Sequence, residues 1–390
     1  MAANKRIRMG MIGGGEGAFI GAVHRHAAGM DGHYELVCGA FSRDPGNNSR
    51  TADSLNVRSE RAYESWETML QQEQALPSDE RMEVVVIVTP NHLHVPISLA
   101  AAKAGFHVFC EKPAASSYAE ACDLQDAMSG ANVLYGLAHT YIGYPMVWQA
   151  RNMVVEGKIG QVRKILVEYP QGWLSAEEET SNKQASWRTD PALAGASGCM
   201  GDIGTHAFGL AEFVSGDKIT TLCADLNTHI NGRRLDDDGA ALFKTASGAS
   251  GVLIASQVCA GEENALTVRV YGDKGGLEWH QMEPNSLVHR AMNAPLRILR
   301  AGIDQPELCP DAQRRLRLPG GHPEGYLEAL ANLYCDFAHA IRHGQTSTTA
   351  PGVPGIESGL RGMAFIEANE LVKTYRPKGA PVLRALDGLD

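Results

Sequence analysis

The sequence predicts an α/β protein with two domains, and three patterns along the chain support this fold class. The first is a short apolar strand, residues 7–12, that runs directly into a glycine-rich turn. The second is a continuous β-branched run at residues 82–88, typical of a central parallel strand buried on both faces. The third is a stretch from residue 164 to residue 279 in which strand patterns alternate with turns. A chain of 390 residues is long enough for two cores, at a prior of about 150 residues per domain.

The composition argues against several classes of function. The formal net charge of -10 disfavours a nucleic-acid partner, which requires a basic patch, although Arg314, Arg315 and Arg317 form a local basic cluster expected at a solvated or interface face. The eight cysteines show no CxxC pair and no metal-ligand spacing, so we expect reduced thiols, no disulfide framework and no metal site. No apolar run approaches the ~18 residues of a membrane span, and the polar start of the chain does not resemble a signal peptide. We therefore expect a cytoplasmic protein without a membrane partner.

The glycine-rich turn at residues 13–21 follows the first strand and precedes a predicted helix. Its first glycine allows a tight turn, the third lets backbone amides approach a pyrophosphate, and the helix N-terminus adds a positive dipole end. The pattern fits either the spacing G-x-G-x-x-A or a longer turn that ends at Gly21, which leaves open the amides that touch phosphate. Its position predicts a dinucleotide-binding Rossmann domain. The residues expected to bind the cofactor here are Gly13, Gly15, Ala18, Phe19 and Ile20.

The tip of the second predicted strand, residues 35–41, should lie beside the adenosine ribose. Ser42 and Arg43 suit a 2′-phosphate, whereas Asp44 suits a 2′-hydroxyl if the loop folds inward. Arg43 can equally stack on the adenine. These residues leave NAD and NADP open, with NAD slightly favoured.

Two further strand ends should meet at the same edge of the sheet. The strand at residues 82–88 ends in a polar loop that would border the nicotinamide ribose, with Thr89, Pro90, Asn91 and His94 as expected cofactor-binding residues. His92 is a further candidate in this loop, and either histidine can instead be solvated or capping. The next strand, ending at Cys110, leads into Glu111, Lys112 and Pro113, and Glu111 and Lys112 are further expected cofactor-binding residues. Because ligands bind outside the carboxyl ends of parallel strands, Lys112 should face the bound molecule, and the alternative is a solvated surface lysine.

A predicted amphipathic helix at residues 202–214 carries the second candidate pair. Asp202 and His206 are four residues apart, so they share one face of the helix. A carboxylate beside an imidazole raises its proton affinity and orients it, as a general base requires. A capping aspartate with a core-edge histidine is the structural alternative, and a metal pair lacks a third ligand at fixed spacing.

Other candidates lie between and after these motifs. Tyr141 falls in the polar and aromatic segment 139–145, Trp187 can stack on a sugar face, and Arg188 can hydrogen-bond hydroxyls, unless the last two only hold their loop. His322 or Glu324 can reach the pocket from the segment before a predicted helix at residues 326–341, against a loop-and-cap alternative.

The second half should form a large sheet with helices on one face. Strands are predicted at residues 164–169, 221–225, 240–245, 251–256, 266–271 and 276–279, with a last helix at 355–375. The uncovered face suggests association with another subunit, so we expect a homodimer or homotetramer. The predicted domains are 1–145, which binds NAD(P), and 146–390, which binds substrate and oligomerises.

The motifs resemble the Gfo/Idh/MocA family, named for glucose-fructose oxidoreductase, inositol dehydrogenase and a rhizopine catabolism protein. The similarity covers roughly the first 220 residues and rests on Thr89-Pro90-Asn91-x-x-His94, Ala104-Gly105-x-His107-Val108-x-Cys110-Glu111-Lys112-Pro113, Tyr144-Pro145, Gly157-Lys158-Ile159-Gly160 and Gly198-x-x-x-Asp202-Ile203-Gly204-Thr205-His206. It implies a Rossmann domain, a second α/β domain with a large, mostly antiparallel open sheet, and dehydrogenation of a pyranose or cyclitol. It also implies that the Lys112–Pro113 bond can be cis. The basic residue that many members place near residues 139–145 is missing, so no substrate-binding arginine is assigned there.

The expected chemistry is hydride transfer between a secondary hydroxyl of an uncharged sugar or inositol and the nicotinamide. His206 would act as general base, Lys112 would stabilise the charge on the reacting oxygen, and Asp202 would orient His206 or bind substrate. Lys112, Tyr141, Trp187, Arg188, Asp202, His206 and His322 are the expected substrate-binding residues. Redox-assisted glycoside cleavage, a non-catalytic nucleotide-sensing regulator and an imine or biliverdin-like reductase stay open as alternatives.

Overall fold

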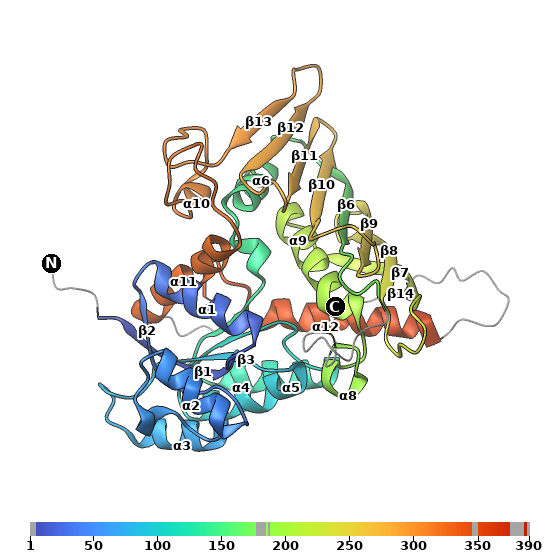
Figure 1. The fold of residues 1–390 in the computed structure, drawn as a ribbon. Helices are drawn as coiled ribbons and strands as arrows, with labels where there is room; N and C mark the ends of the chain where they lie inside the picture. The colour runs from blue at the N-terminus through green and yellow to red at the C-terminus, as the bar shows by residue number, and fades with distance from the viewer. Residues whose placement is uncertain (1–4, 177–184, 186–187, 345–349, 375–385, 388–390) are drawn as a thin grey trace. The chain divides into compact units, whose positions relative to one another are not determined.

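A computed structural model describes residues 5–176, 185, 188–344, 350–374 and 386–387 (Figure 1). The chain divides into two compact units, residues 1–139 with 330–360 and residues 140–329 with 361–390. The sequence predicts a single boundary at residue 145, whereas the structure places the segment 330–360 in the first unit. The reason is that this segment packs against residues far earlier in the chain. The ring of Phe337 lies 5.3 Å from that of Phe109, and the N–H of Leu137 donates to the carbonyl of Pro354 at 2.7 Å.

The first unit contains a five-stranded parallel sheet in the order β2-β1-β3-β4-β5. All five residues of β3 are buried, as the continuous β-branched run predicts. The strands are β1 Ile7–Gly13, β2 Tyr34–Ala40, β3 Val84–Val88, β4 His107–Cys110 and β5 Tyr135–Leu137. The expected parallel sheet is confirmed.

Helices follow the strands of this sheet, and in Figure 1 α1 lies on one side while α4 and α5 lie on the other. The helix α1 comes very close to β1, because a Cβ on Gly21 would lie 2.3 Å from the Cα of Gly14. Only glycines at both positions permit this approach. The helices are α1 Phe19–Met30, α2 Pro45–Ser54, α3 Trp66–Ala75, α4 His94–Lys103 and α5 Tyr118–Gly130, with short turns η1 Ser59–Arg61 and η2 Asn91–Leu93.

The second unit contains a nine-stranded sheet in the order β13-β12-β11-β10-β6-β9-β8-β7-β14. Its neighbouring strands are antiparallel except for β6 and β9, so the expected mostly antiparallel sheet is confirmed. The sequence did not predict its last three strands; β13, for example, has four residues of which three are exposed, too short for a clear alternation. The strands are β6 Val162–Pro170, β7 Ile219–Asn227, β8 Asp238–Thr245, β9 Ser250–Ser256, β10 Thr267–Gly272, β11 Gly275–His280, β12 Ser286–Ala291, β13 Arg297–Arg300 and β14 Leu386–Asp387.

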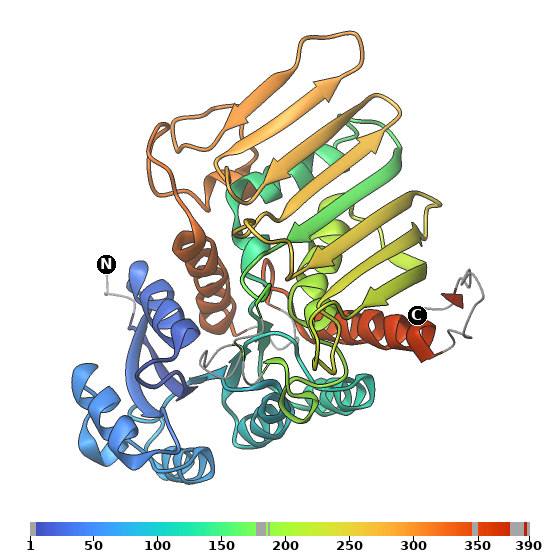
Figure 2. The same cartoon turned by 45° about the vertical axis from the view of Figure 1, so that its right-hand side comes forward.

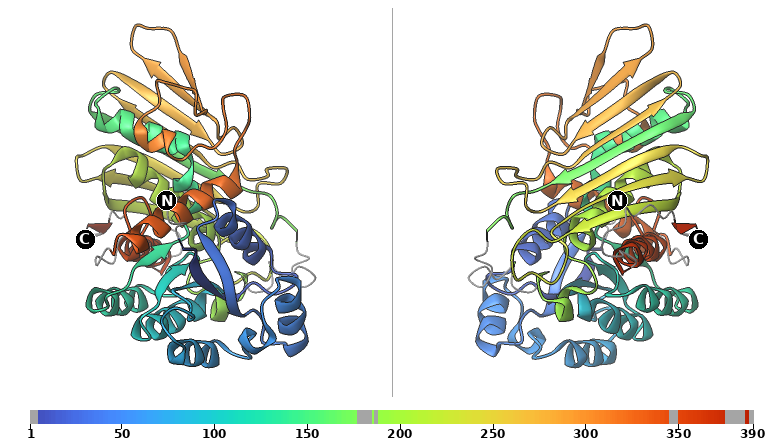
Figure 3. Two further views of the ribbon diagram at one scale, coloured as in Figure 1. Left: turned by 90° about the vertical axis from the view of Figure 1, so that its left-hand side faces the viewer. Right: turned by 90° about the vertical axis from the view of Figure 1, so that its right-hand side faces the viewer.

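Helices cover one face of this sheet, as expected. Figures 2 and 3 show α6 and α9 on that face, and no helix of the described second unit on the opposite one. The predicted helix at residues 202–214 begins as a π-helical turn, Met200–Gly204, before α9. The helices are α6 Pro145–Val155, α8 Pro191–Ala194, α9 Thr205–Ser215, α10 Pro310–Gln313, α11 Tyr326–Arg342 and α12 Ile356–Thr374, with the turn η3 Thr140–Gly143; α11 and α12 each have residues in both units.

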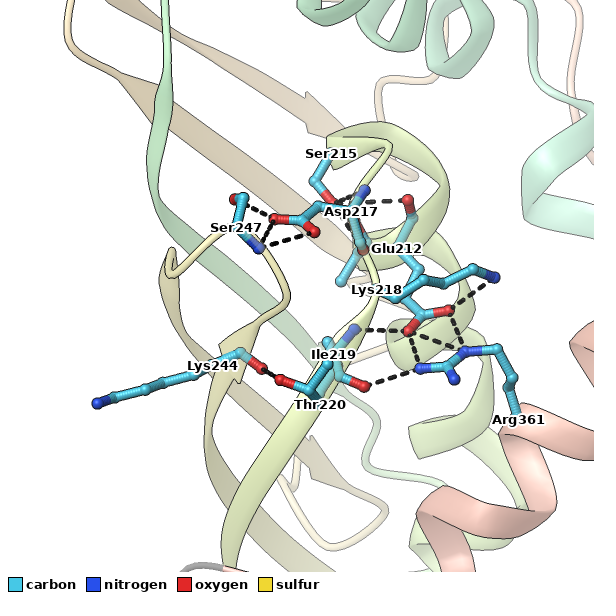
Figure 4. A network of polar contacts seen from close by, with 10 residues as sticks. Glu212, Ser215, Asp217, Lys218, Ile219, Thr220, Lys244, Ser247 and Arg361 are labelled. Carbon is cyan, nitrogen blue, oxygen red and sulfur yellow. Dashed lines mark hydrogen bonds and ion pairs between the residues drawn. The ribbon is translucent and has the colours of Figure 1, made fainter. Parts of the chain in front are cut away.

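A buried ion pair ties α12 to the end of α9 within the second unit (Figure 4). Arg361 donates to both carboxylate oxygens of Glu212, at 2.9 Å from Nε and 2.5 Å from Nη2. The same carboxylate accepts the backbone N–H of Ile219 at 2.8 Å, and Arg361 also donates to the carbonyl of Ile219. The pair therefore joins α9, β7 and α12 at one point.

We predict that Arg361→Met lowers the free energy of unfolding by about 3 kcal/mol, because it removes the buried, doubly hydrogen-bonded cation of Glu212 and leaves only the 3.5 Å contact of the exposed Lys218. Urea denaturation followed by circular dichroism measures the change. Arg163→Met is the matched control: its 3.8 Å pair with Asp273 is exposed, and surface pairs contribute only about 0–1 kcal/mol. Equal losses in the two variants would contradict the structural role assigned to Arg361.

Candidate functional site

The glycine-rich turn presents an uncapped helix N-terminus. Gly13 and Gly14 have φ values of 85° and 74°, which glycine adopts without strain. Ala18 occupies the N-cap of α1, and no described side chain accepts a hydrogen bond at this cap. The first N–H groups of a helix have no intrahelical acceptor, so those of α1 are suited to an anion such as a pyrophosphate.

The structure limits which amides of the turn can meet the phosphate. The N–H of Gly15 donates to the carbonyl of Phe41 at 3.0 Å, and that of Glu16 donates to the hydroxyl of Thr51 at 2.9 Å. These two amides hold the turn against its neighbours. This favours the longer form of the motif, in which Phe19 and Ile20 in the first turn of α1 provide the N–H groups.

Asp44 at the tip of β2 acts as a helix cap. Its Oδ1 accepts the N–H of Asn47 at 2.6 Å at the start of α2, and its own N–H donates to the hydroxyl of Ser42 at 3.2 Å. Arg43 is exposed. The carboxylate is therefore engaged by the helix, which leaves Ser42 and Arg43 as the candidate groups at this tip.

The loop after β3 contains a buried polar atom without a partner. The hydroxyl Oγ1 of Thr89 has no hydrogen-bond partner in the described part of the chain, and neither has Nδ1 of His92. Asn91 is buried. A buried hydroxyl that lacks a partner fits a site that a bound cofactor completes. The turn of α1 and this loop both follow parallel strands, so the residues present fit a dinucleotide.

His94 connects two loops of the first unit. Its Nδ1 lies 2.7 Å from the carbonyl oxygen of Pro113, and its Nε2 lies 2.9 Å from that of Thr89. Burial lowers the pKa of His94, although both carbonyl contacts oppose this shift. Its ring is therefore occupied by the backbone on both sides, and it holds the loop after β3 to the loop after β4.

Lys112 follows β4 and is partly buried, next to a cis peptide bond to Pro113. Its backbone N–H donates to Oε2 of Glu111 at 3.1 Å, and the other carboxylate oxygen lies 2.8 Å from Nε2 of His24. His139, also buried, has a pKa lowered to about 4 by burial and by the positive charge of Lys112. Lys112 thus lies among histidines and one carboxylate.

The second unit holds Asp202 in the middle of the π turn and His206 in the first turn of α9. Oδ2 of Asp202 lies 3.2 Å from Nε of Arg188 and 2.9 Å from Nε2 of Gln257. The ring of His206, only 8 % exposed, meets that of Tyr141 edge-on at 4.9 Å between centroids. Four predicted residues, Tyr141, Arg188, Asp202 and His206, therefore occur in this unit together with an unpredicted glutamine.

A polar network fixes Tyr141 from the side of the sheet. Its hydroxyl contacts that of Tyr169, which donates to Oδ1 of Asn264 at 2.6 Å, while Nδ2 of Asn264 donates back to Tyr141 at 3.1 Å. Nε2 of Gln171 donates to the same Asn264 oxygen at 2.7 Å. Sequence reasoning did not single out these residues as candidates. Tyr169 ends a predicted strand, but nothing local marks Gln171 or Asn264.

The remaining candidates are Trp187, His322 and Glu324, together with the ring that lies near Arg188. Trp187 lies outside the described residues, and the guanidinium of Arg188 lies 5.8 Å from the ring centre of Trp173. His322 is exposed, whereas the carboxylate of Glu324 is buried and accepts the N–H groups of Arg317 and Leu318. Glu324 is therefore the cap of its own loop.

No group of three or more His, Cys, Asp or Glu side chains in the described residue ranges is arranged to hold a metal ion. Within the same ranges, no helix has both the length and the apolar character to span a membrane.

We predict that Asp44→Ala lowers the free energy of unfolding by ~1 kcal/mol, the usual effect of losing an N-cap, and leaves NAD affinity within about twofold. Thermal unfolding and isothermal titration with NAD measure the two quantities. Asp53→Ala, an exposed position on the same helix, is the control and should change neither. A tenfold loss of NAD affinity without a loss of stability would instead make Asp44 a ribose ligand.

Comparison with known proteins identifies the family of this chain. Residues 7–139 match the NAD-binding Rossmann fold of the GFO/IDH/MocA oxidoreductase family, and residues 147–278 match the C-terminal domain of that family. The Bacillus subtilis oxidoreductase YfiI is 32% identical over 93% of this chain and 94% of its own length.

Two solved structures are similar over nearly the whole chain. An inositol dehydrogenase homolog from Azotobacter vinelandii, complexed with NAD+, has a TM-score of 0.92 and 33% identity, covering 98% of this chain and 97% of that one. A levoglucosan dehydrogenase in complex with NADH and levoglucosan has a TM-score of 0.83 and 25% identity, covering 98% and 100%. The Rossmann domain binds NAD, and this chain belongs to the Gfo/Idh/MocA family of oxidoreductases.

Proposed function

We propose that the protein oxidises a secondary hydroxyl of an uncharged sugar or cyclitol with NAD. The observation that carries this proposal is the set around α9: His206 is packed against Tyr141, and Asp202, four residues earlier, is held by Arg188 and Gln257. A solved homolog from Azotobacter vinelandii is complexed with NADH and myo-inositol, and the levoglucosan dehydrogenase with NADH and levoglucosan. Both substrates are neutral cyclic polyols.

The proposed step breaks the C–H and O–H bonds of one carbinol and forms a carbonyl. NAD, when bound, accepts the hydride. His206 takes up the hydroxyl proton as general base, a contribution of roughly 10²- to 10⁴-fold. Lys112 donates a hydrogen bond to the same oxygen and stabilises the negative charge that develops on it.

The charges in the second unit favour an uncharged substrate. The guanidinium of Arg188 is paired with Asp202, so its charge is already balanced within the unit. The other polar side chains of this cluster, Tyr141, Tyr169, Gln171, Gln257 and Asn264, are neutral hydrogen-bonding groups suited to hydroxyls.

We predict that the purified protein forms NADH from at least one member of a panel of inositols, aldoses, anhydrosugars and glycosides. Lys112→Met and His206→Ala should each lower kcat by roughly 10²- to 10⁴-fold while NAD still binds. Lys103→Met and His26→Ala are matched controls at exposed positions and should leave kcat unchanged.

The products separate this function from its alternatives. Release of an aglycone from a glycoside without net NADH would identify redox-assisted cleavage. Cofactor binding with no turnover of any member of the panel would contradict the proposed dehydrogenase and favour a nucleotide-sensing regulator.

We also propose that a second copy of the chain covers the open face of the nine-stranded sheet. Leu242, Ile254 and Ile298 on that face are 57%, 40% and 56% exposed. One row across the sheet alternates apolar blocks with a central charged pair, Arg269 and Glu278, which gives a self-complementary surface. Its members in register are Cys223, Leu242, Val252, Leu166, Arg269, Glu278, Val288 and Ile298.

We predict that the protein sediments as a dimer or tetramer and that the double variant Leu242→Lys, Ile254→Lys sediments as a monomer, because two charges would be buried without partners. Sedimentation velocity measures the masses. Leu318→Lys, at an exposed leucine outside the sheet, is the control. A wild-type monomer, or an unchanged mass in the double variant, would rule out this face as the interface.

A further inference from the structure

A buried cluster of three polar side chains lies behind the lysine loop of the first unit and takes no direct part in the proposed chemistry. His24 comes from α1, Glu111 follows β4, and Tyr334 comes from α11. They are 0%, 9% and 2% exposed. Nε2 of His24 lies 2.8 Å from Oε1 of Glu111, and its Nδ1 lies 2.6 Å from the hydroxyl of Tyr334.

The hydrogen bonds of the cluster define one arrangement of protons. If the Tyr334 hydroxyl donates to Nδ1 of His24, the imidazole is neutral and its Nε2–H donates to Glu111. Every proton then has an acceptor, and the negative charge stays on the Glu111 carboxylate. The ring of Tyr334 stacks on that of Phe109, with 4.5 Å between the ring centroids. The backbone carbonyl of Tyr334 accepts a hydrogen bond from the hydroxyl of Tyr34 at 2.9 Å.

The surroundings of Glu111 stabilise its ionised form. Burial opposes ionisation, but the hydrogen bond from His24 and the positive charge of Lys112 favour it, and the pKa of Glu111 is lowered. The titratable groups that face this carboxylate are His24 on α1, His94 on α4, Cys110 at the end of β4, Lys112 and His139 in the adjoining loops, and Tyr334 on α11.

Stability alone does not account for this cluster. Replacing a buried ionic or polar pair by apolar side chains of similar volume is often neutral or stabilising, so such a pair is weak evidence for a structural role. A proton relay is also a poor explanation, because the series of hydrogen bonds ends at a tyrosine hydroxyl in the core. What the cluster does is hold a carboxylate at the loop, where Oε2 of Glu111 accepts the backbone N–H of Lys112 at 3.1 Å.

We propose that His24 and Tyr334 are positioning residues that keep Glu111 as a carboxylate and hold it against the backbone N–H of Lys112. The inference rests on the proposed function, in which Lys112 contacts the reacting oxygen. His24 acts through Glu111 and does not touch the substrate.

The test compares His24→Leu with His24→Gln, whose amide N–H can replace the bond to Glu111, and with His26→Leu, an exposed position on the same helix. Infrared difference spectra against pH report the carbonyl stretch of a protonated carboxyl group. Losing a hydrogen bond to a charged group costs about 1.5–3 kcal/mol, so the pKa of Glu111 should rise by roughly one to two units in His24→Leu. The new titrating band should vanish when Glu111→Gln is added.

Kinetics with the polyol that the wild type oxidises complete the test. We expect kcat to fall at least tenfold in His24→Leu, with KM and NAD affinity within about twofold, and to recover partly in His24→Gln. If His24→Leu does not fold, His24→Met carries the same test with a more adaptable side chain.

Different outcomes would overturn the positioning role and the proposed function. Absence of the new band, or an unchanged kcat in a folded His24→Leu protein, would overturn the positioning role. A wild type that oxidises no polyol would overturn the proposed function instead, and the infrared band alone would then decide whether His24 keeps Glu111 ionised.

Discussion

Lys112 depends on two buried histidines that hold the residues on either side of it. His24 binds the carboxylate of Glu111, and His94 binds the carbonyl of Pro113 at 2.7 Å. The backbone at the carboxyl end of β4 is thereby held from α1 on one side and α4 on the other. A lysine side chain has many rotamers, so a fixed backbone is the least costly way to restrict where its ammonium group can lie.

In the second unit, other elements restrict the positions of the candidate side chains. A π turn precedes α9. The N–H of Met200, its first residue, and that of Gly198, two residues before it, each donate to the buried carboxylate of Asp236 at 2.7 Å. Asp202 in this turn is then held by Arg188 and by Gln257, which follows β9. The helix supplies His206, and the hydroxyl and amide network of Tyr141 fixes the aromatic ring against it. Each side chain of the cluster is thus oriented by another element.

The first unit leaves polar groups where a ligand can use them. The uncapped first turn of α1 and the unpaired hydroxyl of Thr89 cost stability in the absence of a partner, because buried or oriented polar groups normally find one. These costs are tolerated at a binding site, where the bound molecule supplies the missing acceptors and donors. In the same turn, the amides of Gly15 and Glu16 hold the turn against its neighbours. The amides of the first turn of α1 are then the ones left for a ligand.

The sequence by itself determined the fold class, the order of most elements and the positions of the motifs. These features depend on local patterns: the β-branched run of β3, the glycine turn before α1, and the alternation along the strands of the second sheet. It also placed Lys112, Asp202 and His206 at the ends of elements, where parallel strands and helix starts present side chains. It did not predict β13, a four-residue strand with three exposed residues, or β12, in which burial does not alternate along the strand.

Only the tertiary structure decided the partners of these residues. His24 and Tyr334 are separated by 310 positions, and Asp202 and Gln257 by 55, so no local spacing could join them. The same holds for residues 330–360, which belong to the first unit because of the aromatic and backbone contacts they make there. The tertiary structure also showed that Asp44 caps α2, because its carboxylate accepts the backbone N–H of Asn47. Local pattern specifies which element forms, whereas long-range packing specifies which side chains meet, and the chemistry of the site depends on the second.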